Sequence, residues 1–251
     1  MPRLIPFRLV AACALALVLV LSTAVAAAAK GTPVDLRVVG GGSKVLAEKA
    51  LSASTTSIKT SPKALCFGQG TGGSGKSVTI KGPTALGVLG QAAKSTAALR
   101  PLLVTDYFVS EFGLGLCGIG KAGTTSKLSW YLKVNHKNPN RSGETVKLHA
   151  GDEVLWALEP YPYPKELSLV APSAASAGVP FEVRVFSYSD KGKRKPAAGA
   201  TVTGATAPTD AEGRTTVTIT ESTTLVATHG KDIPSNRVPV SGCVGVCPLG
   251  S

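Results

Sequence analysis

The sequence predicts an α+β domain followed by a small all-β sandwich. The first half of the chain combines several strand patterns with a single short amphipathic helix pattern. Its clearest segment, residues 127–135, alternates apolar and polar residues with a period of two. After residue 165 the helix signals vanish, and short β-rich runs alternate with turns rich in Gly, Pro and Asp. These three observations define the expected fold class.

The chain begins with a pattern typical of a secretory signal peptide, which we place at residues 1–29. Arg3 and Arg8 precede a long run of Ala, Leu and Val, and small residues come just before Lys30. An apolar run of about 20 residues could instead be retained as a membrane anchor. The Ala-rich end favours cleavage, so we expect no stable membrane span in the mature chain. A secreted protein, or one of the cell envelope, is the expected product.

The mature chain is basic. Two of the 27 Lys and Arg lie in the leader, which leaves 25 against 15 Asp and Glu, a net charge of +10. Such a charge suits a polyanion, an acidic envelope surface or an acidic ligand, and it also suits a plain solvated surface. The basic residues are scattered apart from residues 190–196, with no arginine-rich stripe and interleaved aromatics. We therefore expect no nucleic-acid partner.

Four cysteines remain after the leader: Cys66, Cys117, Cys243 and Cys247. An even number in an exported chain indicates disulfides, with three possible pairings. Proximity in sequence favours Cys243 with Cys247, which leaves Cys66 with Cys117. A zinc site is the alternative, but no cysteines form a C-x-x-C and the three histidines lie far apart in sequence. We expect no metal.

The first segments of the mature chain predict a β-hairpin at residues 34–50, turned by three glycines. Residues Gly70–Ser77 then match the phosphate-binding pattern G-x-x-x-x-G-K-[ST]. A phosphate-binding loop needs a helix that begins at its Lys-Ser. Ser77 is followed instead by Val78, Thr79 and Ile80, three β-branched residues that favour a strand. We expect a surface turn and a strand at 77–81, and no bound nucleotide.

The single helix is expected after Pro83. Thr84 is suited to the N-cap, and Leu86, Leu89 and Ala93 recur at helical spacing. A further strand is expected at residues 101–109.

Residues 127–135 predict a half-buried strand. Leu128, Trp130, Leu132 and Val134 should face the core, where Trp156 of a neighbouring strand would join them. The opposite face is then either plain solvent surface or a ligand surface. The candidate ligand-binding residues are those on this face and at its end: Tyr131, Lys133, Asn135 and His136.

The segments that follow complete the first domain and define the second. We expect a turn after residue 135, a strand ending at His149, a tight turn at Gly151-Asp152 and a strand through Trp156. The domains then run as follows: first domain 33–160, Pro/Tyr hinge 161–165, β-sandwich 166–240 and Cys-containing tail 241–251.

The first domain resembles the transcobalamin C-terminal-like domain, a β-grasp module of the soluble-ligand-binding type. The resemblance covers about residues 34–160 and rests on these matches: Trp130-Tyr131, Val134-Asn135, Gly151-Asp152, Trp156 and the helix Thr84–Ala92. The family's usual Asn-Gly turn is Asn135-His136 here, so we expect a longer loop. The Gly-rich, cysteine-flanked insertion also departs from the family. In cobalamin carriers this domain caps a ligand held mainly by a helical partner domain, and no such pattern is found here, so no cofactor is expected and cobalamin is only weakly implied.

The second domain resembles bacterial immunoglobulin-like or carboxypeptidase-regulatory-like modules. The match is the turn Thr209-Asp210-x-x-Gly213 between two strand patterns. Such modules act as spacers or adhesive units, which implies a supporting role for this half of the chain.

No enzyme signature is present: G-x-S-x-G and H-E-x-x-H are absent. We therefore expect no catalytic residues. The sequence favours an exported, non-enzymatic binding or interaction protein whose β-grasp domain is presented on a β-sandwich spacer. Its partner would be a small molecule, a glycan or an envelope protein. The alternative is an adhesive or structural protein of the envelope surface without a small-molecule ligand.

Overall fold

The computed structural model describes residues 31–244, and its fold is mostly β-strand. The expected leader (1–29) and Cys247 lie outside the described residues. Within residues 31–244, no helix combines the length and the apolar character that a membrane crossing requires.

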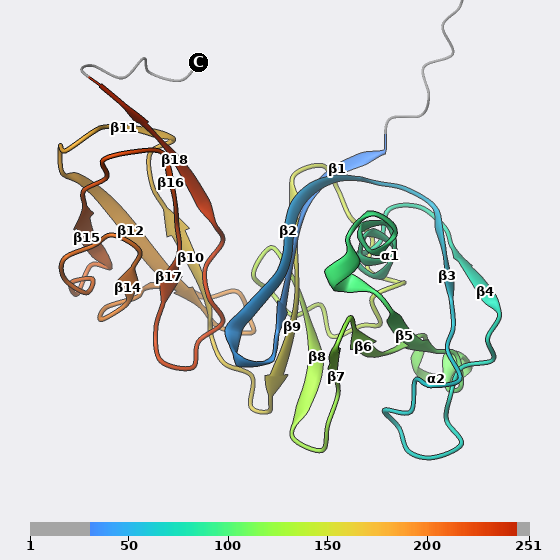
Figure 1. The fold of residues 1–251 in the computed structure, drawn as a ribbon. Helices are drawn as coiled ribbons and strands as arrows, with labels where there is room; N and C mark the ends of the chain where they lie inside the picture. Colours follow the sequence, from blue (N-terminus) through green and yellow to red (C-terminus); the bar gives the residue numbers. More distant parts are fainter. Residues whose placement is uncertain (1–30, 245–251) are drawn as a thin grey trace, which may run out of the picture. The chain divides into compact units, whose positions relative to one another are not determined.

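Four strands form the first sheet: β1 (Thr32–Gly40), β2 (Lys44–Ala53), β8 (Leu128–Val134) and β9 (Asp152–Pro160). Their order is β2-β1-β9-β8 (Figure 1), which makes β8 an edge strand of the ladder. The pair β1–β2 is the expected hairpin, turned through the short 3-10 helix η1 (Gly41–Ser43). β1 runs parallel to β9, whereas β9 and β8 are antiparallel.

Helix α1 (Ala85–Ser95) lies beside this sheet (Figure 1) and begins as the sequence predicts. The Thr84 hydroxyl accepts a hydrogen bond of 3.1 Å from the Gly87 N–H, which satisfies a donor of the first turn. The strands β3 (Thr56–Lys59) and β4 (Ser77–Ile80) form a separate antiparallel pair. A strand therefore begins directly after Lys76, as the β-branched run predicts.

A third group of strands is smaller, and the disulfide joins it to the glycine-rich segment. It contains β5 (Leu102–Thr105), β6 (Gly115–Ile119) and β7 (Ala122–Gly123). The predicted strand 101–109 stops at Thr105, and Val109–Phe112 forms the short helix α2. The 3-10 helix η2 (Ala97–Leu99) links α1 to β5. The disulfide Cys66–Cys117 is confirmed, with Cα atoms 5.1 Å apart. Cys243 is also disulfide-bonded.

The remaining strands follow the predicted β-rich runs. One sheet contains β10 (Glu166–Val170), β12 (Phe181–Tyr188), β13 (Arg194–Pro196) and β15 (Arg214–Val217), and the others contain β11 (Ala174–Ser176), β14 (Thr201–Val202), β16 (Thr223–Leu225), β17 (Ala227–Thr228) and β18 (Val238–Cys243). The Thr-Asp-x-x-Gly segment is a turn, because the Asp210 carboxylate accepts hydrogen bonds from the N–H groups of Glu212 and Arg214.

The buried apolar residues fall into two main clusters. One lies between 34 and 158 and contains Trp130 and Trp156, as predicted, and the other lies between 167 and 240. A small third cluster joins Val39, Leu155 and Ala157 to Ile233, so strands of the first sheet pack against the segment that follows β17. The domain boundaries themselves stay a prediction.

The predicted strand ending at His149 is wrong. Only an isolated bridge between Thr84 and Lys147 forms there. The Val146 carbonyl accepts from the Ala85 N–H, and the Leu148 N–H donates to the Pro83 carbonyl. The segment therefore runs along the start of α1, and its backbone groups are used there instead of in a ladder.

The expected long loop after β8 is also wrong, because Asn135 and His136 form a two-residue turn. The N–H of Val134 donates to the Lys137 carbonyl at 2.9 Å, and the Lys137 N–H donates back at 3.0 Å. Asn135 and His136 have φ angles of 49° and 65°, the positive values that a type I′ turn requires at both central positions.

Candidate functional site

The second face of β8 is buried, which corrects the expectation of a half-buried strand. Tyr131 is 3% exposed and Lys133 is 0% exposed. The ring of Tyr163 stacks on Tyr131 with centroids 3.8 Å apart, and the Tyr188 ring stacks on His136 at 3.7 Å. Residues distant in sequence therefore cover the face that local alternation leaves open.

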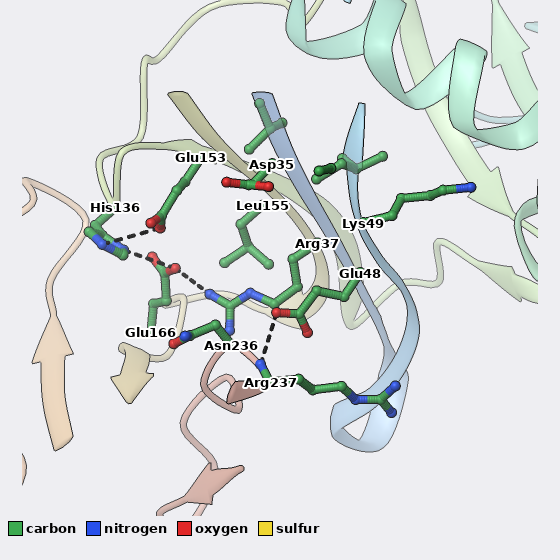
Figure 2. A pocket seen from close by; sticks show the side chains of 13 residues that line it. Asp35, Arg37, Glu48, Lys49, His136, Glu153, Leu155, Glu166, Asn236 and Arg237 are labelled. Atoms are coloured by element: carbon green, nitrogen blue, oxygen red, sulfur yellow. Dashed lines mark hydrogen bonds and ion pairs between the residues drawn. The ribbon is translucent and has the colours of Figure 1, made fainter. Parts of the chain in front are cut away.

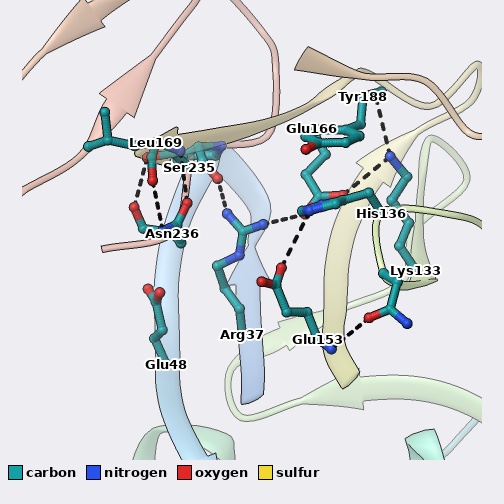
Figure 3. Close-up of polar contacts among 12 residues, drawn as sticks. Arg37, Glu48, Lys133, His136, Glu153, Glu166, Leu169, Tyr188, Ser235 and Asn236 are labelled. Atoms are coloured by element: carbon teal, nitrogen blue, oxygen red, sulfur yellow. Dashed lines mark hydrogen bonds and ion pairs between the residues drawn. The ribbon is translucent and has the colours of Figure 1, made fainter. Parts of the chain in front are cut away.

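Glu166, the first residue of β10, is the centre of a buried ionic cluster. Figure 3 shows Arg37, Lys133 and His136 directed toward its carboxylate. The distances from Glu166 oxygens are 2.5 Å to Arg37 Nη2, 3.4 Å to Lys133 Nζ and 3.1 Å to His136 Nδ1. We call these four residues the ionic cluster. It connects β1, β8 and the turn after β8 to the first strand of the second half.

The charges within the ionic cluster set its protonation. Burial alone would raise the pKa of Glu166, but the hydrogen bond from His136 and the charges of Arg37 and Lys133 bring this pKa below its usual value. Burial lowers the pKa of Lys133, and Glu166 counteracts that effect. Lys133 Nζ also donates to the Tyr188 carbonyl at 3.3 Å, and Arg37 Nη1 donates to the Pro234 carbonyl.

A polar cavity of about 290 Å³ lies beside the ionic cluster (Figure 2). On one side, Glu153 lies 3.5 Å from His136. On the other, Glu48 accepts a hydrogen bond of 2.8 Å from the Arg237 N–H, and burial raises the pKa of Glu48. Acidic and basic side chains both line this cavity, and four of them are paired with one another: Arg37, His136, Glu153 and Glu166. Such an arrangement is suited to holding segments together.

Asn135 stabilises the turn it begins. Its side-chain amide donates to Asp152 Oδ1 at 2.8 Å and its carbonyl oxygen accepts from the Glu153 N–H at 3.0 Å. Asp152 in turn accepts from the His149 N–H at 2.7 Å. The Asp152 N–H also donates to the His149 carbonyl at 3.2 Å, so Asp152 closes the predicted turn at Gly151-Asp152.

A second and larger cavity, of about 500 Å³, opens along β8. We call it the aromatic cleft. Aromatic rings from five segments line it, at Phe67, Phe112, Trp130, Tyr131, Trp156 and Tyr163.

The polar lining of the aromatic cleft is one-sided in charge. The loop after the β8 turn contributes Asn138, Asn140, Arg141 and Ser142. Arg141 is the only ionisable cation among the lining residues, and none of them is an Asp or a Glu. The cleft therefore offers apolar rings, the amide side chains of Asn138 and Asn140, and one positive charge.

The structure separates the predicted ligand-binding residues. Tyr131 lines the aromatic cleft, and burial followed by the neighbouring Asp190 raises the pKa of its hydroxyl. Lys133 and His136 lie in the ionic cluster, and Asn135 stabilises the turn. Sequence reasoning missed Arg37 and Glu166, whose charges in otherwise apolar strand patterns are a usable signal. It also missed Phe67 and Phe112, which no local pattern marks.

Comparison with known proteins gives no match to a family model, a curated protein or a solved structure. Within residues 31–244, no three His, Cys, Asp or Glu side chains are grouped closely enough to hold a metal ion.

Proposed function

We propose that the protein is an exported, non-enzymatic binding protein that takes its ligand in the aromatic cleft. In this proposal residues 33–160 are a transcobalamin C-terminal-like β-grasp domain, and residues 166–240 are an immunoglobulin-like module that supports it. The observation that carries the proposal is the cleft itself, about 500 Å³ beside Tyr131. Its volume lies in the range of ligand sites, which are mostly apolar with a few polar groups that fix orientation.

The ligand chemistry follows from the lining. Aromatic rings favour flat or apolar groups, and stacked or edge contacts with them add about 0.5–1.5 kcal/mol beyond area burial. Arg141, in a lining that contains no Asp or Glu, favours a ligand with a negative charge. The basic net charge of the chain would assist the approach of such a ligand.

The test is a panel of anionic and neutral metabolites and glycans, read by thermal shift and by tryptophan fluorescence. Phe112→Ala removes a ring that is 73% exposed at the cleft, so it should weaken binding about tenfold without loss of stability. Val109→Ala is the matched control, because Val109 lies on the same short helix, is 50% exposed and does not line the cleft. Equal binding by both variants would argue against the cleft as the site.

A second candidate function is adhesion to the cell envelope. It is favoured by an exposed apolar group around α2, where Phe67, Tyr107, Val109 and Phe112 are each at least half exposed. Exposed apolar clusters of this kind mark interaction surfaces. Tight adsorption to envelope polymers, with no saturable ligand in the panel, would favour adhesion over the binding function.

A further inference from the structure

The aromatic cleft lies along the edge of β8. Residues Leu128, Ser129, Trp130, Tyr131 and Leu132 all line it, although their side chains alternate between the two faces of the sheet. A cleft over one face would be lined by every second residue. Consecutive residues of one strand line the same cleft only when it runs beside the strand, where the main-chain groups point.

The outward main-chain groups of β8 are satisfied at both ends. The Asn135 N–H points toward β9 and donates to the Glu153 carbonyl. The N–H and C=O of Val134 point away from β9, and both are hydrogen-bonded to the backbone of Lys137. In an antiparallel pair, the main-chain groups of successive residues point alternately toward the partner strand and away from it. The N–H and C=O of Leu128 therefore also point away from β9, and both are hydrogen-bonded to Thr125.

Between these ends, the main-chain N–H and C=O groups of Trp130 and Leu132 point away from β9 as well. Within residues 31–244, no hydrogen bond uses the backbone N–H or C=O of either residue on that side. Two donors and two acceptors thus face the cleft, with the two residues about 7 Å apart along the strand. Unpaired groups of this kind are a template for another strand.

The sequence explains why no strand of this chain pairs with the edge of β8 at these two residues. Continuing the Val134–Lys137 register would place Pro139 opposite Leu132. Proline has no N–H, so it cannot continue the ladder. The chain leaves instead, and the Asn138 N–H donates to the Asp190 carbonyl at 2.9 Å. The loop that departs, with Asn138, Asn140 and Arg141, lines the cleft together with the start of β6 at Gly115 and Leu116.

We propose that the aromatic cleft binds an extended acidic peptide, which pairs as an added strand with the edge of β8 at Trp130 and Leu132. The inference rests on the proposed function and names its ligand class. Main-chain hydrogen bonds would supply affinity, and the aromatic rings would accept alternate side chains. Arg141, in a lining without Asp or Glu, selects a carboxylate on the peptide.

The probe is the acetylated, amidated octapeptide Val-Glu-Val-Glu-Val-Glu-Val-Glu, titrated into the purified, isotope-labelled protein and followed by NMR. We expect saturable shifts and new protection from exchange at the amides of Trp130 and Leu132. The same sequence with Lys in place of Glu should bind about tenfold more weakly. A version methylated on every peptide nitrogen should not bind, because it has no main-chain donors.

Two charge reversals locate the carboxylate. Arg141→Glu should weaken the Glu peptide about tenfold. Lys127→Glu is the matched control, since Lys127 is exposed close to β8 and does not line the cleft, and it should change binding less than about twofold. Equal binding of the methylated peptide overturns strand addition and leaves the binding function intact. No binding of the Glu peptide, with a metabolite still bound in the cleft, overturns the peptide as ligand alone.

Discussion

The ionic cluster and the aromatic cleft use the same strand in opposite ways. On one face of β8, Lys133 is fully buried and shares Glu166 with Arg37 and His136, so these four charged side chains are directed at one another. Along the edge of β8, Trp130 and Leu132 leave their outward main-chain groups unpaired beside a cavity. Polar groups that are paired internally stabilise the fold, and those left open are available to a partner. The ionic cluster is therefore expected to stabilise the fold, and the open edge supports the proposal that the cleft binds a ligand.

The largest expected effect on stability comes from removing the disulfide Cys66–Cys117, which lies beside the aromatic cleft. Cys66 lines the cleft, and its disulfide closes a loop with a sequence separation of 51. Replacing both cysteines, Cys66→Ser with Cys117→Ser, should lower the free energy of unfolding by about 4 kcal/mol, because the unfolded chain gains entropy. Urea unfolding of this variant against the oxidised parent measures it. A decrease in the free energy of unfolding of less than about 1 kcal/mol would contradict a stabilising role of the disulfide.

The next effect tests the ionic cluster. Glu166→Gln leaves Arg37 and Lys133 buried beside a neutral amide, so it should cost about 3 kcal/mol of stability. Glu182→Gln is the matched control, since Glu182 lies 3.8 Å from Arg214 and both side chains are largely exposed. The control should change stability by less than about 0.5 kcal/mol. Similar losses in both variants would mean that the cluster does not hold the two halves together.

A smaller effect has the opposite sign. Glu159 lies on β9 and forms no ion pair within residues 31–244, and burial raises its pKa to about 7. The unfolded state then holds fewer protons at this site between about pH 4.5 and pH 7, so Glu159 lowers stability increasingly as the pH rises through that window. Glu159→Gln should raise the free energy of unfolding by about 1–2 kcal/mol at pH 8, after allowance for solvent screening, and leave it unchanged at pH 4. Equal effects at both pH values would contradict the raised pKa.

The sequence predicts the local elements well and the covered faces poorly. The alternation at residues 127–135 and the Thr84 cap are local patterns, and both elements form as expected. The burial of Tyr131 and Lys133 depends on Tyr163, Glu166 and Tyr188, which are not neighbours in β8. Periodicity reports that a strand has two faces, but it does not report what covers the second one.

The turn after β8 shows how a long-range contact overrides a local preference. His136 is an unusual choice where glycine is favoured, which is why the sequence predicts a longer loop. Stacking on Tyr188 and the contact with Glu166 hold the ring in place, and the positive φ of 65° is tolerated. The cleft also could not be predicted from the sequence, because only the register of the hairpin shows that Pro139 falls opposite Leu132.

The open edge of β8 is the central claim, and amide hydrogen exchange of the free protein tests it most directly. Tyr131 and Lys133 direct their N–H groups into the ladder with β9, whereas those of Trp130 and Leu132 face the cleft. We predict slow exchange at Tyr131 and Lys133 and exchange at least about a hundredfold faster at Trp130 and Leu132. Equal protection of all four amides would contradict the account, because it would mean that the edge is already paired.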